Sequence, residues 1–219
     1  MNLLDWKGAP RPDRITLDGR YARLEPLDPA QHGADLLRSA QQPGAGDRFR
    51  YLFEEPPPDA AAFAPWLETA AASADPLFFA VVDRATGRAE GRQSLMRIEP
   101  AHGAVEIGHI LWGPAIARTR VVTEALFLHA AYVFDALGYR RFEWKCNNDN
   151  EPSKRAALRF GFTFEGVFRQ HMVQKGRNRD TAWFAMTDSD WLRLRAGYEA
   201  WLRPDNFDAD GQQRSKLAF

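Results

Sequence analysis

One stretch of the sequence, residues 105–162, constrains the fold more than any other. It begins with an apolar, β-branched run at 105–112, which predicts a strand. Apolar residues then recur at three- and four-residue steps until Gly138, which predicts a helix with one buried face. A second predicted strand, 141–146, is followed by a turn and a short helix. The stretch therefore predicts a strand–helix–strand–helix unit around which the rest of the chain is arranged.

The junction between the first strand and the long helix carries the first functional signal. Arg118 and Arg120 lie where that helix is predicted to begin. The first amide groups of a helix have no partner within it, and together with the helix dipole they favour an anion. The sequence therefore predicts a phosphate site here. The alternative is that both arginines are solvated surface cations.

Several short segments share their order and spacing with a known family. They are Glu106-Ile107-Gly108-His109-Ile110, Arg118-Thr119-Arg120 with Thr123-Glu124-Ala125, Asn150-x-x-Ser153, Gly161-Phe162-x-Phe164-Glu165-Gly166, Arg169, Lys175-Gly176-Arg177-x-Arg179-Asp180 and Asp190-Trp191. In these segments the chain resembles the GNAT-fold N-acetyltransferases of the RimJ/RimL-like branch. The resemblance covers roughly residues 14 to 192 and rests on order and spacing together, since no single segment is specific.

The resemblance implies an enzyme that binds acetyl-CoA as acetyl donor and lets an amine attack the thioester directly in a ternary complex. It implies that CoA lies across an opening between the strands at 105–112 and 141–146. The family's usual pyrophosphate loop is Gln/Arg-x-x-Gly-x-Gly/Ala, and this chain departs from it because Arg120 and Val122 stand where small residues are expected. The implied cofactor-binding residues are Ile110, Leu111, Trp112, Arg118, Thr119, Arg120, Val121, Val122, Thr123, Asn150 and Ser153.

Transfer to an amine needs a base, because an amine is mostly protonated at neutral pH. The resemblance places Glu106 on the strand that admits the pantetheine arm, so we predict Glu106 as the base. The alternative is an ion pair between Glu106 and Arg97 or Arg92 on a neighbouring strand. His109 is a further candidate, which simple alternation places on the opposite face of the strand unless a bulge intervenes.

The departing thiolate needs a proton source. The resemblance places Ser153 at the start of the helix beside the thioester, and we predict that its hydroxyl donates this proton. Its alternative role is to satisfy the amide groups at the helix N-terminus. Asn150 is predicted to bind the pantetheine amides, and it is equally placed to cap the same helix.

Composition excludes several classes of function. The chain of 219 residues has 29 basic and 29 acidic side chains, so its neutral balance predicts no binding to nucleic acid or to a membrane. No apolar run approaches about 20 residues, and the start lacks the layout of a signal peptide, so we expect a cytoplasmic protein. Five histidines without ligand spacing and a single cysteine, Cys146, predict no metal site and no internal disulfide.

We predict one α/β domain with a mixed, mostly antiparallel sheet of six or seven strands and helices on both faces. It covers 1–219, with a core at about 14–192, an irregular lead-in at 1–13 and a polar, loosely held tail at 204–219. Asp28 and Asp59 are predicted to cap two helices, which end near Ala40 and Ala72. A last helix is predicted from Asp190.

The acceptor amine depends on loop shapes around 41–58 and 168–180. The N-terminal α-amine of a protein or peptide, ribosomal-protein-like, is favoured, and a small amine is the alternative; a catalytically silent acyl-CoA sensor is a different class. A homodimer is compatible with these observations. Aromatic residues of the second helix, Phe63 and Trp66, either line an acceptor pocket or pack in the core. The charged turn that holds Lys175, Arg177, Arg179 and Asp180 either steers an acidic acceptor or is a solvated hairpin.

Overall fold

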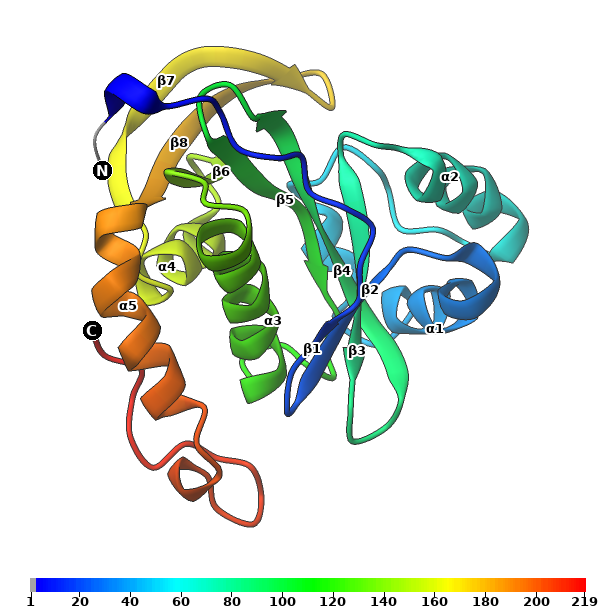
Figure 1. Ribbon diagram of the computed structural model, residues 1–219. Helices are drawn as coiled ribbons and strands as arrows, with labels where there is room; N and C mark the ends of the chain where they lie inside the picture. Colours follow the sequence, from blue (N-terminus) through cyan, green and yellow to red (C-terminus); the bar gives the residue numbers. More distant parts are fainter. Residues whose placement is uncertain (1–2) are drawn as a thin grey trace.

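Eight strands form one sheet in the computed structural model of the chain, which describes residues 3–219 (Figure 1). The prediction of six or seven strands was too low, because a two-residue edge strand and both arms of the last hairpin join the same sheet. The main elements are β1 (Leu17–Asp18), β2 (Ala22–Pro26), α1 (Pro29–Ala40), α2 (Ala60–Ala72), β3 (Leu77–Asp83), β4 (Arg88–Glu99), β5 (Ala104–Trp112), α3 (Arg120–Ala131), β6 (Arg141–Asn147), α4 (Glu151–Arg159), β7 (Thr163–Gln174), β8 (Arg177–Thr187) and α5 (Asp188–Trp201).

The pairing of the strands creates one discontinuity in the sheet. The order is β1-β2-β3-β4-β5-β6-β8-β7, and every neighbouring pair is antiparallel except β5 with β6. The parallel pairing of β5 and β6 runs from Ala104–Arg141 to Ile107–Trp144 and stops there. β5 continues to Trp112 beside β4 alone, so one edge of its second half is free of β6.

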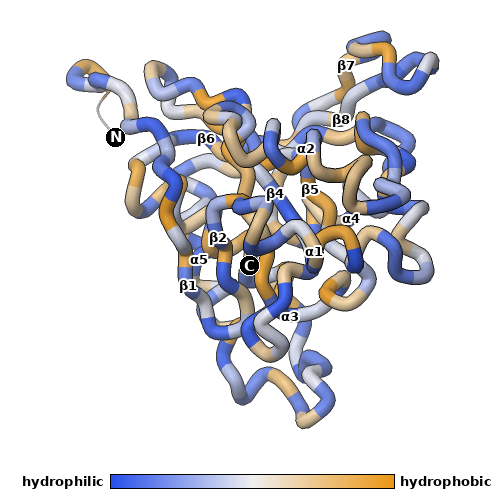
Figure 2. The backbone as a smooth tube through the Cα atoms, turned by 90° about the vertical axis from the view of Figure 1, so that its right-hand side faces the viewer, coloured by the Kyte–Doolittle hydropathy of each residue, from blue (hydrophilic) through white to orange (hydrophobic). Residues whose placement is uncertain are grey.

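Helices cover the two faces of the sheet, as predicted. α1 and α2 lie on one face, and α3, α4 and α5 lie on the other (Figure 1). A small apolar core that includes Leu36, Phe63 and Phe78 lies beneath α1 and α2. A larger core, which includes Leu126 and Trp191, lies beneath α3 and α5. The β7–β8 hairpin extends from the far edge of the sheet (Figures 1 and 2).

The predicted helix starts are confirmed. Asp28 accepts the amides of Ala30 and Gln31 at 2.8 and 3.0 Å, and Asp59 accepts the amide of Ala62 at 2.8 Å. These caps satisfy amide groups that a helix leaves without partners. The last helix begins at Asp188, slightly before the predicted Asp190, because the Thr187 side chain and Asp190 form a capping box.

The C-terminal tail is packed, contrary to the expectation that it is loosely held. Phe207 is buried and its ring meets Trp201 edge-on, with the centroids 5.0 Å apart. The Trp201 indole N–H is 3.0 Å from both Gln213 Oε1 and the Ser215 carbonyl. The tail is polar on average, but its few aromatic side chains bury their surface against α5.

Residues 1–2 of the predicted lead-in lie outside the described residues. None of the helices in residues 3–219 is long and apolar enough to cross a membrane.

Candidate active site

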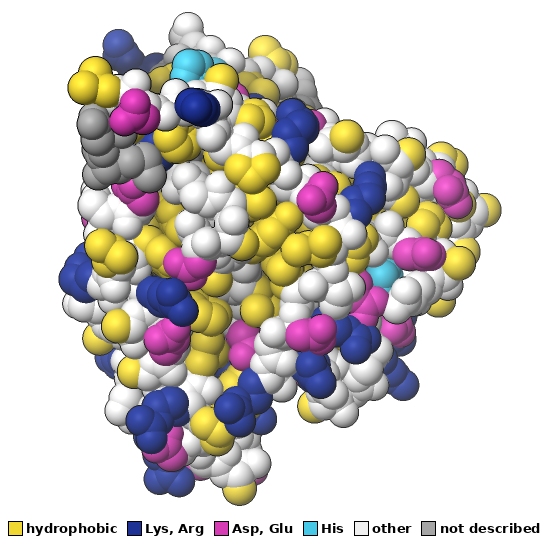
Figure 3. Space-filling model, in the orientation of Figure 1, with side chains coloured by type: hydrophobic (Ala, Val, Ile, Leu, Met, Phe, Trp, Pro, Cys, Tyr) yellow, Lys and Arg dark blue, Asp and Glu magenta, His cyan; other side chains and the backbone are white. Residues whose placement is uncertain are grey.

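A cleft of about 950 Å³ opens where β5 and β6 part. Its walls come from β4, β5, β6, α4, the β7–β8 hairpin and the segment that follows α1. The volume lies near the upper end of the range of roughly 300–1,000 Å³ that is usual for small-molecule sites. On the face of the molecule seen in Figure 3, basic and acidic side chains are interspersed. The cleft, in contrast, is lined by more cations than carboxylates.

A bulge places both candidate bases in this cleft. The pairing of β4 with β5 shifts between Arg92 and Ser94, where β5 holds one extra residue, and His109 has a φ of 48°. Such a bulge reverses the alternation of side chains along the strand. His109 therefore lines the cleft together with Glu106, rather than facing the opposite side of β5.

Glu106 is buried and paired with two cations. Its Oε2 lies 2.8 Å from Arg97 Nη1 and 2.9 Å from Lys145 Nζ. The ion pair with Arg97 considered from the sequence is present, whereas Arg92 pairs with Glu54 instead. Lys145 is not among the residues predicted from the sequence. Its contact with Glu106 follows from the parallel register, in which Glu106 stands opposite Glu143, and no local pattern indicates that register.

His109 is held in the form that can accept a proton. Burial lowers the pKa of His109, and the charge of Arg92 lowers it further. The imidazole is therefore neutral near neutral pH. Arg92 also donates to the His109 carbonyl oxygen at 2.9 Å, which ties the bulge to β4.

The start of α4 presents the predicted polar pair to the cleft. Asn150 Oδ1 accepts the Ser153 amide at 3.2 Å, so Asn150 is the N-cap and also lines the cleft. Ser153 therefore does not cap the helix. Its Oγ accepts the indole N–H of Trp144 at 2.9 Å, and its hydroxyl also interacts with the side chain of Cys146.

Beyond the free end of β5 the cleft is lined by arginines. Arg48, Arg118, Arg155 and Arg159 all face it, and no carboxylate among residues 3–219 lies within 4 Å of their charged nitrogens. Burial lowers the pKa of Arg48 and the charge of Arg118 lowers it further, and both cations line this part of the cleft. Two unpaired cations so close together form a site for an anion.

The other predicted cofactor-binding residues lie along β5, in the loop before α3 and in the first turn of α3. Ile110, Leu111 and Trp112 line the cleft along the free edge of β5, and Val122 lines it from the first turn of α3. Thr119 is the N-cap of α3, with its hydroxyl 3.2 Å from the Val121 amide, and Thr123 accepts Arg159 Nη1 at 3.2 Å. The Arg120 guanidinium lies 4.4 Å from the ring centre of Tyr21 and does not line the cleft. Arg118, with a φ of 64°, is the residue in this loop with left-handed backbone.

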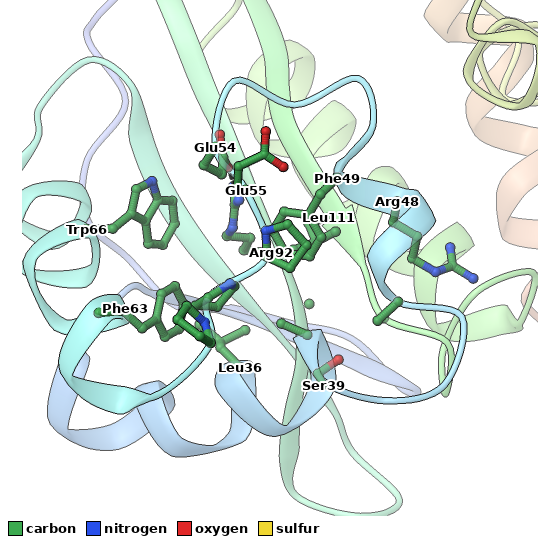
Figure 4. A pocket seen from close by; sticks show the side chains of 18 residues that line it. Leu36, Ser39, Arg48, Phe49, Glu54, Glu55, Phe63, Trp66, Arg92 and Leu111 are labelled. Atoms are coloured by element: carbon green, nitrogen blue, oxygen red, sulfur yellow. Dashed lines mark hydrogen bonds and ion pairs between the residues drawn. The ribbon is translucent and has the colours of Figure 1, made fainter. Parts of the chain in front are cut away.

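A smaller cavity of about 220 Å³ adjoins the cleft and shares Arg48 and Leu111 with it (Figure 4). The aromatic residues Phe63 and Trp66 of α2 line this cavity. Arg92 lies between them and the segment that follows α1, where its buried guanidinium is ion-paired with Glu54 and lies 4.2 Å from the Trp66 ring centre. In Figure 4 the Arg48 side chain points away from this pair.

Among the described residues, no group of three or more His, Cys, Asp or Glu side chains is arranged to hold a metal ion.

The mixed sheet, its one parted parallel pair and the cation-lined cleft define an α/β fold with a small-molecule site at a break in the sheet. A family model described as an acetyltransferase (GNAT) domain matches residues 23–163. The crystal structure of a GCN5-related N-acetyltransferase from Brucella melitensis is 57% identical, with a TM-score of 0.97, and covers 98% of this chain and 97% of that one. The chain therefore belongs to the GNAT acetyltransferase family.

Two further comparisons are more distant. The uncharacterized N-acetyltransferase YoaA of Bacillus subtilis is 39% identical over 80 residues, which make up 36% of this chain and 45% of that protein. The chain thus spans about half the length of this curated relative. The structure of a Salmonella typhimurium acetyltransferase that modifies the N-terminal serine of ribosomal protein L7/L12 has a TM-score of 0.68, at 18% identity over 79% of this chain and 99% of that one. This last likeness shows the fold alone.

The buried Arg92–Glu54 pair leads to a prediction about stability. Removing one partner of such a pair leaves an uncompensated charge, so Glu54→Gln should lower the free energy of unfolding by about 3 kcal/mol. Glu55→Gln is the matched control, because Glu55 is exposed and pairs with Lys175 at the surface. Urea unfolding of both variants tests this. Equal stability of Glu54→Gln and wild type would show that the pair contributes nothing.

The same pair predicts the direction of the pH dependence. Burial acts to raise the pKa of Glu54, but the charge and hydrogen bond of Arg92 outweigh it and hold this pKa below its ordinary value. A carboxyl group whose pKa is depressed in the folded state stabilises the fold above its unfolded pKa of about 4.3. That stability is lost as the pH falls through the folded pKa. The difference between wild type and Glu54→Gln should therefore shrink in acid.

Proposed function

We propose that the protein is an acetyl-CoA-dependent N-acetyltransferase that acetylates a primary amine by direct attack in a ternary complex. The observation that carries this proposal is the parting of β5 from β6 after the Ile107–Trp144 pair. The parting opens the cleft, leaves a free strand edge along it, and brings Glu106 and Ser153 into the same space. Family membership supports the reaction type.

The cleft has the chemistry that CoA requires. The pantetheine arm is proposed to pair with the free edge of β5 at 110–112, where strand N–H and C=O groups lack a β6 partner. Asn150 supplies a side-chain amide to the same arm. The pyrophosphate is proposed to bind at the start of α3 beside the side chains of Arg118 and Arg48, where first-turn amides are available; the amides of Thr119 and Val121 already donate to the Ile116 carbonyl and the Thr119 hydroxyl. Arg120 would contribute its backbone amide, because its side chain lies against Tyr21.

The reaction needs three groups, and the cleft offers a candidate for each. Glu106 is proposed to remove a proton from the acceptor amine, directly or through water. Free N–H groups of β5 beyond Ile107 are available to the oxyanion. Ser153 is proposed to protonate the departing CoA thiolate. Ser153→Ala should then slow transfer without weakening acetyl-CoA binding, and a parallel loss of affinity would contradict this role.

The acceptor is proposed to be the N-terminal α-amine of a protein or peptide, within the RimJ/RimL-like branch. Support comes from the shared fold of the Salmonella enzyme, whose substrate is a ribosomal protein. A small amine is the second candidate, because the cleft of about 950 Å³ has room for one. A silent acyl-CoA sensor is the candidate from another class. A cytoplasmic location and a homodimer stay predictions, and light scattering tests the latter.

Incubation with acetyl-CoA tests the proposed activity. N-terminal peptides, amino acids, polyamines and aminoglycosides serve as acceptors, and mass spectrometry detects a gain of one acetyl group. Free thiol release without any amine measures the background hydrolysis. Transfer to at least one amine above this background is expected and eliminates the sensor. Tight binding of acetyl-CoA with no transfer to any acceptor would overturn the enzyme in favour of the sensor.

The phosphate site predicts unequal effects of three arginines. Arg118→Gln and Arg48→Gln should each weaken acetyl-CoA binding by about 1–3 kcal/mol, because each removes a charge-assisted contact. Arg120→Gln should leave the affinity almost unchanged, since that side chain is stacked on Tyr21. Arg88→Gln, at an exposed site outside the cleft, is the control. Calorimetry measures all four, and unchanged affinity in Arg118→Gln would rule out this placement of the pyrophosphate.

Two matched substitutions distinguish which of the two candidates, Glu106 or His109, acts as the base. Glu106→Gln should lower kcat/KM by about 10²–10⁴-fold, the usual share of a general base. His109→Gln should lower it less than about tenfold if the imidazole only shapes the bulge. Higher pH should restore part of the loss in Glu106→Gln, because more of the amine is then already deprotonated. The reverse order of the two losses would assign the role to His109.

A further inference from the structure

A second group of cations lines the cleft near its closed end. Glu106 stands just before the point where β5 and β6 part, and Arg97 and Lys145 both contact its Oε2. Arg179 of β8 lines the same part of the cleft and lies close enough to Arg97 and Glu106 to feel the charge of each. This group is separate from Arg48 and Arg118, which follow the open end of β5.

Arg179 is the member of this group without a counter-ion. No carboxylate in residues 3–219 lies within 4 Å of its charged nitrogens. Its Nη1 makes a contact of 3.3 Å with Gln174 Oε1, and its Nε is buried without a hydrogen-bond partner. The ring of Phe53 lies 5.7 Å from the guanidinium carbon. A partly buried cation without a partner is costly, so the site favours an anion that enters from the cleft.

The carboxylate next to Arg179 in the sequence does not pair with this cation. Asp180 accepts the Gln170 amide at 2.7 Å and the Asn178 side chain at 2.8 Å. These contacts hold a bulge in β7, where Gln170 has a φ of 50°. Asp180 is therefore used on the hairpin itself, while Arg179 faces the cleft. The hairpin is thus not merely a solvated turn.

We infer that the acceptor is an amine that carries a carboxylate, and that Arg179 binds this carboxylate while the amine faces Glu106. The inference rests on the proposed function, because it names the acceptor of the same site. A planar guanidinium matches a carboxylate in two parallel hydrogen bonds. Because Arg179 and Glu106 line the same part of the cleft, a compact acceptor that carries the carboxylate and the amine close together can reach both. Both the α-carboxylate of an amino acid and the side chain of an N-terminal aspartate or glutamate satisfy this.

Paired acceptors test the inference. Glutamate is compared with glutamate diamide, and a peptide that begins with glutamate and ends in an amide is compared with the same peptide beginning with glutamine. Phosphoethanolamine replaces the carboxylate with a phosphate. The assays use wild type, Arg179→Gln, Arg179→Lys and Arg177→Gln, the last being an exposed arginine of the same hairpin. Free amino acids preferred over peptides would identify an α-carboxylate, and the opposite preference would identify an acidic N-terminal side chain.

The carboxylate form of at least one pair should have a kcat/KM about 10- to 100-fold higher, the scale of one charge-assisted pair. In Arg179→Gln this preference should disappear through a rise in KM for the acceptor, with the KM for acetyl-CoA and the melting temperature unchanged. Arg179→Lys should keep part of the preference, and Arg177→Gln should keep all of it. Transfer that is equally fast with the neutral partners, or fastest with phosphoethanolamine, overturns the inference and leaves the proposed function intact.

A binding measurement separates this inference from the reaction itself. Calorimetry with N-acetylglutamate and with its diamide requires no turnover. Carboxylate-dependent binding that Arg179→Gln abolishes, in a protein that transfers acetyl to none of the amines, would refute the proposed function and support the anion site. Absence of such binding, in wild type that does acetylate neutral amines, would refute the anion site alone.

Discussion

The early end of one parallel strand pairing is the constraint on which the site depends. β5 and β6 share hydrogen bonds only as far as Ile107 and Trp144. Beyond that pair β5 is bent by the bulge at His109, and β6 leads into the turn that Asn150 caps. The backbone N–H and C=O groups along this free strand edge need other hydrogen-bond partners. A bound molecule with amide groups can supply them. The cleft is a consequence of this divergence.

Charge is distributed within the cleft in a way that the neutral composition conceals. Glu106 is held by Arg97 and Lys145 near the closed end, and unpaired arginines line the open end. Burial of Glu106 and of the Lys145 side chain strengthens their interaction relative to water, whereas the arginines at the open end are exposed. Figure 3 shows both signs interspersed on one face, and the chain has 29 basic and 29 acidic side chains, so the excess of positive charge belongs to the site and not to the whole molecule. That arrangement suits a highly anionic cosubstrate at one end and a carboxylate-bearing acceptor at the other.

The two segments expected to shape the acceptor site contact each other. Lys175 donates to the carbonyl oxygens of Phe49 and Glu54 at 3.1 and 3.2 Å, and Gln174 donates to Tyr51 at 2.9 Å. The segment that follows α1 is thereby tied to the β7–β8 hairpin across the cleft. Glu54 in this segment also pairs with Arg92, which lines the smaller cavity. Arg92 in turn donates to the His109 carbonyl in the bulge of β5, so this segment is connected to both.

The sequence by itself determined the order of elements and the capped helices that begin after Asp28 and Asp59, and it predicted a candidate site on 105–162. These features depend on local periodicity and on side chains that cap their own helix, so they can be predicted without knowledge of distant neighbours. Only the tertiary structure decided that Arg120 packs on Tyr21, that the tail buries Phe207, and that Lys145 and Arg179 join Glu106. Those contacts depend on strand register, on a bulge in β5 and on another in β7, and they join residues that lie on different strands or far apart in the chain. No pattern within a single segment specifies them, because a shift of one residue in pairing turns each side chain to the other face of the sheet.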